Sequence, residues 1–140
     1  MPERVRAWVE AGGLGLPRSV NVECHDLAAA VGLARTLTGC EPVEVFAEAS
    51  GAVLVASMLM THGVVASLVV GPVPGTGSAR LIGSHGHTEI DLDEPSVRHH
   101  GPGGVRRIPI EPQIVHSGPA IVVEAVGRSL ASGRPERVHP

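Results

Sequence analysis

The first side chains that could do chemistry are Glu23, His25 and Asp26, which stand where a strand at 19–24 should meet a helix at 27–38. An imidazole titrates near neutral pH, so His25 could act as a general base oriented by a neighbouring carboxylate. Alternatively, Asp26 only caps the helix, because its carboxylate can accept the free N–H groups of the first turn. Both interpretations stay open, and the cap is favoured.

A second group, His87, Glu89 and Asp91, lies in the string 85–91. Alternate residues of a strand point to one face, so the three side chains should share a face. Imidazoles and carboxylates could together bind a divalent ion. A solvated hairpin face explains the same alternation, and spacing alone brings no further histidine to the string. We therefore predict no metal and no other cofactor.

A third group surrounds the turn at 101–104 and consists of Arg98, His99 and His100, followed by two arginines at 106–107. Arginine makes bidentate contacts to carboxylates and phosphates, so this basic group could hold an anionic ligand or an acidic partner. A solvated hairpin tip is the alternative, and it is favoured because charged residues are mostly exposed.

Met58 and Met60 lie in an apolar segment and alternate with Leu59. Methionine side chains adapt to irregular surfaces, so these two could line a ligand pocket or an interface. The simpler alternative places both in the core.

Composition excludes several classes of function. The sequence contains no lysine, which Schiff-base aldolases, enzymes of pyridoxal phosphate and Walker A nucleotidases all require. One Phe, one Trp and no Tyr leave no aromatic platform for bases, so no nucleic-acid role is expected. No apolar run reaches the roughly 18 residues of a membrane span. Cys24 and Cys40 are predicted to be buried thiols in a cytoplasmic protein.

The elements that must position these residues follow from apolar periodicity. The 140 residues suffice for one core, so 1–140 is predicted to be a single domain. Helices are predicted at 2–11, 27–38 and 118–132, and a first strand at 19–24. Seven more strands are predicted at 43–49, 52–60, 64–70, 79–83, 87–92, 96–100 and 105–110.

These elements predict an α+β fold. Strands joined by short turns form a mainly antiparallel sheet, here an open sheet of about six or seven strands in two layers, with helices on one face. The strands predicted at 52–60 and 64–70 are apolar at nearly every position. We therefore expect the uncovered face, on which we place Met58 and Met60, to be hidden in a homodimer or larger assembly.

Six segments, taken in order, resemble the C-terminal substrate domain of the Gfo/Idh/MocA oxidoreductases. The hairpin at 81–92 follows the family's pattern GxxGxxxxDL, and the last helix ends, like the family's closing helix, in GxP. The six segments are 11–20, 34–39, 42–45, 63–68, 81–92 and 124–135. In that family a Rossmann domain binds NAD(P), while the C-terminal domain holds the substrate and dimerises. The resemblance implies these last two roles for this chain.

The chain departs from the family where redox chemistry would be done. No G-x-G-x-x-G opens a strand–helix unit, and there is no lysine to match the family's catalytic lysine. The family's Asp…His…Asp run falls on His25, Ala29 and Gly32, so none of its side chains is kept. We therefore expect the chain to bind no NAD(P) by itself, and no catalytic residue is carried over from the family.

Three hypotheses of function remain. The first is a stand-alone relative of the substrate domain that binds a small molecule, or a separate Rossmann-type oxidoreductase subunit, as a dimer. The second is a non-redox enzyme, an isomerase, lyase, dehydratase or cyclase, which uses Glu23, His25 or Asp26 for acid–base catalysis. The third and weakest is a metal-dependent enzyme centred on His87 and Glu89. Whether the chain is an enzyme stays open at this point.

Overall fold

The computed structural model describes residues 17–73, 77–84, 86–92, 96–101, 104–109 and 120–138. In the seventh and eighth strands it describes the side chains of Arg98 and His100 only. The elements are β1 (Pro17–Cys24), α2 (Leu27–Thr38), β2 (Pro42–Ser50), β3 (Val53–Met60), η1 (Thr61–Gly63), β4 (Val65–Val70), β5 (Gly77–Gly83), β6 (Gly86–Asp91), β7 (Ser96–Gly101), β8 (Gly104–Pro109), α3 (Ala120–Ser132) and β9 (Glu136–Arg137).

The predicted α+β fold is confirmed. The nine strands form one sheet in the order β8-β7-β6-β5-β1-β4-β3-β2-β9. The seven strands predicted between residues 43 and 110 are β2 to β8, each within two residues of its expected bounds. The helix predicted at 2–11 lies outside the described residues. In the part of the chain that the structure describes, no helix is long and apolar enough to cross a membrane.

The position of β1 differs from a simple meander. β4 and β5 follow each other in the chain, yet β1 lies between them, parallel to β4 and antiparallel to β5. The remaining pairings are antiparallel. β1 therefore stands at the centre of the sheet, and the polar residues of its exposed face lie beside those of β5, which lie in turn beside those of β6.

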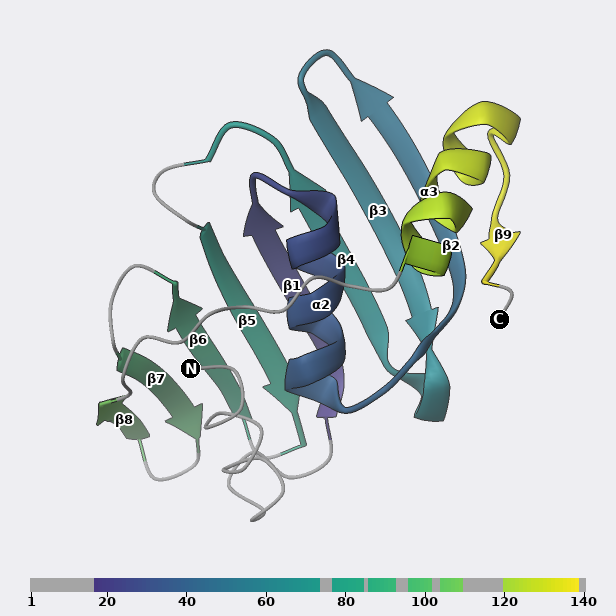
Figure 1. Ribbon diagram of the computed structural model, residues 1–140. Coiled ribbons are helices and arrows are strands. Elements are labelled where there is room, and N and C mark those ends of the chain that lie inside the picture. Colours follow the sequence, from purple (N-terminus) through teal and green to yellow (C-terminus); the bar gives the residue numbers. More distant parts are fainter. Residues whose placement is uncertain are drawn as a thin grey trace.

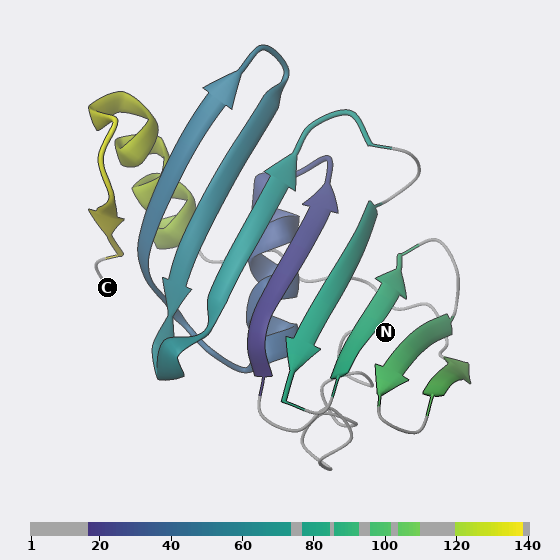
Figure 2. The same ribbon diagram turned by 180° about the vertical axis from the view of Figure 1, so that it is seen from behind.

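The two α-helices in the described part of the chain lie on one face of the sheet (Figure 1). Helix α2 packs across β1 and β4, and α3 packs on β2. Seen from behind, no described helix or strand covers the central strands of the sheet (Figure 2). We call this uncovered side the open face.

Met58 and Met60 lie on the helix side of the sheet, so their predicted place on the open face is wrong. Their side chains are 0% and 2% exposed and belong to the core between sheet and helices. The alternation of β3 instead turns Val55 and Leu59 to the open face, where about half of each residue is exposed.

An apolar patch covers part of the open face. It consists of Val53, Val55, Leu59 and Val65, which are 37 to 49% exposed. Cross-strand register places Leu59 directly opposite Val65 and Val55 opposite Val69, and the pair Ser57–Ser67 lies between these two apolar pairs. Exposed aliphatic groups gathered in this way are unusual on a monomer and typical of an interface.

The N-terminus of α2 is capped by Asp26. Its carboxylate accepts the N–H of Ala29 at 2.9 Å, while the Asp26 backbone is extended. We expect Asp26→Ala to lower the free energy of unfolding by about 1 kcal/mol, because one N–H of the first turn loses its acceptor. Asp26→Ser should keep most of the stability. Urea unfolding of both variants measures the difference, and equal losses would contradict a capping role.

Candidate functional site

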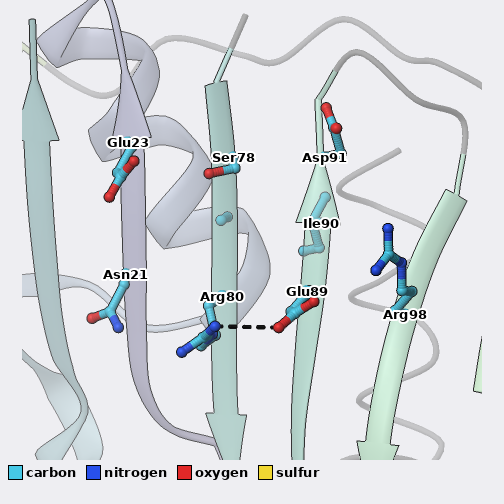
Figure 3. A pocket seen from close by; sticks show the side chains of 9 residues that line it. Asn21, Glu23, Ser78, Arg80, Glu89, Ile90, Asp91 and Arg98 are labelled. Carbon is cyan, nitrogen blue, oxygen red and sulfur yellow. Dashed lines mark hydrogen bonds and ion pairs between the residues drawn. The ribbon is translucent and has the colours of Figure 1, made fainter. Parts of the chain in front are cut away.

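A polar pocket lies on the open face of the sheet (Figure 3). It is beside the apolar patch because β1, which lines the pocket, is the neighbour of β4. Its volume is about 470 Å³, within the usual range for small-molecule sites. Four strands contribute to it, since β1, β5, β6 and β7 are neighbours in the sheet. The lining residues are Asn21, Glu23, Ser78, Ala79, Arg80, Glu89, Ile90, Asp91 and Arg98.

Cross-strand register explains why the polar residues meet. Arg80 lies opposite Asn21 on one side and Glu89 on the other. Arg98 in turn lies opposite Glu89. Ser78 pairs in the same way with Glu23 and Asp91. Two rows of polar side chains therefore cross the sheet, one residue to a strand.

Charge in the pocket is organised around Glu89. Its carboxylate is 3.2 Å from a guanidinium nitrogen of Arg80 and 3.5 Å from Nε2 of His100. Partial desolvation alone would raise the pKa of Glu89, but its contacts with His100 and Arg80 together outweigh that effect and lower the pKa. Glu89 is therefore an anion near neutral pH.

At the edge of the pocket, Glu89 lies close to two histidines. The rings of His87 and His100 are stacked, with centroids 4.4 Å apart and planes inclined by 11°. Nε2 of His87 is 3.8 Å from one Glu89 oxygen, and Nε2 of His100 is 3.5 Å from the other. Such separations are at or beyond the limit of a hydrogen bond.

The structure separates the first predicted group. Glu23 faces the polar pocket, whereas the Asp26 carboxylate is engaged as the cap of α2. His25 is exposed in the link between strand and helix and is not among the pocket residues. Cys24, which points to the core, has a raised pKa, chiefly through burial. The side chains of Glu23, His25 and Asp26 therefore do not form one site.

The other predicted ligand-binding residues also lie in different places. Arg98 lines the pocket, and His100 belongs to the group around Glu89. The side chain of His99 is outside the described residues, as are those of the two arginines at 106–107. Met58 and Met60 lie on the opposite side of the sheet from the pocket.

Three polar pocket residues were not singled out from the sequence, namely Asn21, Ser78 and Arg80. Each alternates with buried residues of its strand, so its direction could have been predicted from the alternation. Their proximity could not, because it depends on β1 pairing with β5 rather than with a neighbour in the chain.

No protein-family model matches the sequence, and no curated protein does so either. Solved structures do match. An oxidoreductase from Agrobacterium radiobacter has a TM-score of 0.78 at 15% identity, over 98% of this chain and 61% of that one. The aldose-aldose oxidoreductase from Caulobacter crescentus gives 0.79 at 18% identity, over 97% and 60%. Levoglucosan dehydrogenase gives 0.80 at 13% identity, over 99% and 63%.

The likeness therefore extends over nearly all of this chain, which spans 60 to 63% of the length of these three proteins. At such low identity it defines the fold and not the activity. The order of elements agrees with the resemblance found in the sequence. The chain has the fold of the C-terminal domain of Gfo/Idh/MocA-type oxidoreductases.

Proposed function

We propose that the chain is a ligand-binding and dimerising domain whose polar pocket holds a small hydroxylated molecule. The observation that carries this proposal is the pocket itself, in which charged and amide side chains from four adjacent strands converge on one volume. Converging polar groups in a concave site are the usual means of orienting a small ligand.

The chemistry of the lining favours hydroxyl and carboxylate groups on the ligand. The carboxylates of Glu23 and Asp91 accept hydrogen bonds from hydroxyls, and the amide of Asn21 both donates and accepts them. The guanidinium of Arg98 can hold a ligand carboxylate in a bidentate manner. A sugar acid or a related polyhydroxy acid offers both kinds of group.

The similar structures agree with this class of ligand. The one from Agrobacterium radiobacter contains L-tartaric acid, and the one from Caulobacter crescentus contains glycerol. Levoglucosan dehydrogenase contains levoglucosan. All three molecules are rich in oxygen and small enough for a volume of about 470 Å³. They support the class of ligand rather than its location on this chain.

Dimerisation is the second part of the proposal, and it rests on the apolar patch. The patch on β3 and β4 lies next to the pocket on the same open face. A second copy that covers the patch would leave the pocket at the rim of the interface, where a ligand could enter. A separate nucleotide-binding subunit is a further partner that this fold would suit.

An acid–base enzyme centred on His25 receives less support. Among the described residues, the carboxylate nearest to His25 in sequence, Asp26, is occupied by the helix cap. Glu23 faces the polar pocket instead. We therefore favour ligand binding over catalysis for this chain.

The pocket can be tested by thermal denaturation of the purified chain with tartrate, gluconate, glycerol and glucose. We expect the acids to raise the melting temperature more than the neutral compounds, because guanidinium groups bind carboxylates. Arg98→Ala should abolish the preference for acids, and Asn21→Ala should weaken all binding. Arg35→Ala is the matched control, since Arg35 pairs with Glu41 outside the pocket. Equal responses of the wild type, the pocket variants and the control would refute the proposed site.

A further inference from the structure

The sequence predicts no metal because spacing brings no distant histidine to the string 85–91. The sheet supplies one, since the antiparallel pairing of β6 and β7 places His100 directly opposite His87. Glu89 lies two residues beyond His87 on the same face. One potential ligand atom from each of these three residues lies within 4.8 Å of the other two. We call this group the His–Glu cluster.

We infer that the His–Glu cluster binds a divalent first-row transition metal, with His87, His100 and Glu89 as ligands. Two imidazoles and one carboxylate are a donor set that zinc and its neighbours accept, and they leave at least one coordination position open. The inference does not depend on the organic ligand proposed above, because the metal would bind to protein atoms alone.

Nε2 of His100 provides an independent reason. The atom is shielded from water and has no hydrogen-bond partner within the described residues. A buried polar nitrogen without a partner is costly, so its position requires an explanation. The nearest carboxylate oxygen, on Glu89, is 3.5 Å away, which is too far for a good hydrogen bond. A metal ion between the two atoms would satisfy both.

The distances are close to those of a metal site. Zinc ligands at 2.0–2.2 Å in a tetrahedron lie about 3.3 Å from one another. The 3.5 Å from Oε2 of Glu89 to Nε2 of His100 needs to close by only a few tenths of an ångström, and one ligand atom from each of the three residues already lies within 4.8 Å of the other two. The two carboxylate oxygens of Glu89 each lie near a different imidazole, Oε1 near His87 and Oε2 near His100.

The stacked rings must turn for both to bind one ion. The nitrogen lone pairs of an imidazole lie in the plane of its ring, so two nearly parallel rings 4.4 Å apart hold their lone pairs in separate, nearly parallel planes. Rotation about χ2 of histidine is soft, so a modest turn of each ring suffices. The side chains of His87 and His100 are 36% and 30% exposed, which leaves room for that turn.

Arg80 would support the site from outside the coordination shell. Its guanidinium contacts Oε1 of Glu89, whereas Oε2 is the oxygen nearer to His100. The carboxylate could therefore bind the metal through Oε2 and stay oriented by Arg80 through Oε1. Glu89 also lines the polar pocket, so the open coordination position would lie near the pocket.

Calorimetric titration of zinc chloride into the untagged chain, previously stripped with a chelator, tests the inference. We expect about one zinc per chain, and an affinity at least about tenfold lower in His87→Ala, His100→Ala and Glu89→Gln. All three positions are partly exposed, so the variants should fold, and circular dichroism checks that they do. His62→Asn is the matched control, because asparagine tolerates the positive φ of that position and the imidazole removed is outside the cluster.

Binding of cobalt(II) can be measured by visible absorption, which is independent of the calorimetric signal. A four- or five-coordinate cobalt site should show visible absorption in the wild type and in His62→Asn, and this absorption should be lost in the three cluster variants. Absence of zinc binding, or zinc binding that is unchanged in all three cluster variants, would overturn the inference.

Discussion

Gly77→Ala is expected to lower the free energy of unfolding by about 3 kcal/mol or more, combining backbone strain with overpacking. Gly77 has φ +121°, a conformation that side chains rarely adopt. A Cβ added there would overlap the carbonyl oxygen of Glu23 and lie 3.0 Å from Cα and Cβ of Cys24. All of these atoms belong to β1, whose backbone is held between β4 and β5 and cannot easily move away.

The same substitution should weaken the polar pocket. Gly77 pairs with Cys24, and the next pair along the strands is Ser78 with Glu23, both of which line the pocket. A shift of β5 away from β1 would separate these two side chains. Ligand-induced stabilisation should therefore fall in Gly77→Ala even where the variant is still folded.

Gly127→Ala is the matched control for Gly77→Ala. Gly127 is exposed in the middle of α3, and an added Cβ meets no atom within 4 Å. Alanine favours a helix interior over glycine, so this variant should gain about 0.5–1 kcal/mol. Urea unfolding followed by circular dichroism compares the two. If Gly77→Ala is as stable as the wild type, the close approach of β5 to β1 does not constrain the fold.

The local elements of this fold could be predicted from the sequence because their signals are local. Apolar periodicity defined α2, and alternation between glycine- and proline-rich turns defined β2 to β8. The cap at Asp26 and the stop at Gly39, which has a left-handed backbone, follow the same kind of rule.

Strand order could not be predicted in the same way. β4 and β5 are neighbours in the chain, and sequence alone favours pairing between such neighbours. In the structure β1 separates them, and both the pocket and its Asn21 depend on that insertion. The His–Glu cluster depends likewise on the register of β6 with β7, which brings His100 to His87.

The faces of β3 were ambiguous for a different reason. When both faces of a strand carry apolar residues, the sequence does not show which face packs against the helices. Met58 and Leu59 are equally suited to a core by type, yet Met58 is 0% exposed and Leu59 is 48% exposed. Only the packing of the helices on one face distinguishes them.

Leu59→Asp is expected to convert the proposed dimer into a folded monomer. The apolar patch has Leu59 at one end of β3 and Val65 directly opposite it on β4. A carboxylate at Leu59 stays solvated in the monomer but would be buried without a partner in a dimer that covers the patch. The double variant Val55→Asp/Leu59→Asp should leave no dimer at micromolar concentration.

Two substitutions to aspartate separate an interface effect from a folding effect. Met58 is the chain neighbour of Leu59 but is buried in the core, so Met58→Asp places an unpaired charge there. This variant should lose about 4 kcal/mol or more of stability and give unfolded or insoluble protein. Ile121→Asp places the charge on α3 at a residue 38% exposed, on the helix layer rather than the open face, and should leave the dimer intact.

Light scattering and circular dichroism on the wild type and these four variants test the prediction. A folded monomer for Leu59→Asp, beside dimers of the wild type and Ile121→Asp, is the expected result. Obligate interfaces commonly bury about 2,000 Å² or more, so the wild-type dimer should persist on dilution to micromolar concentration. A wild type that is already monomeric would show that the apolar patch is not covered by a second copy, and it would leave the pocket and the His–Glu cluster to be judged by their own tests.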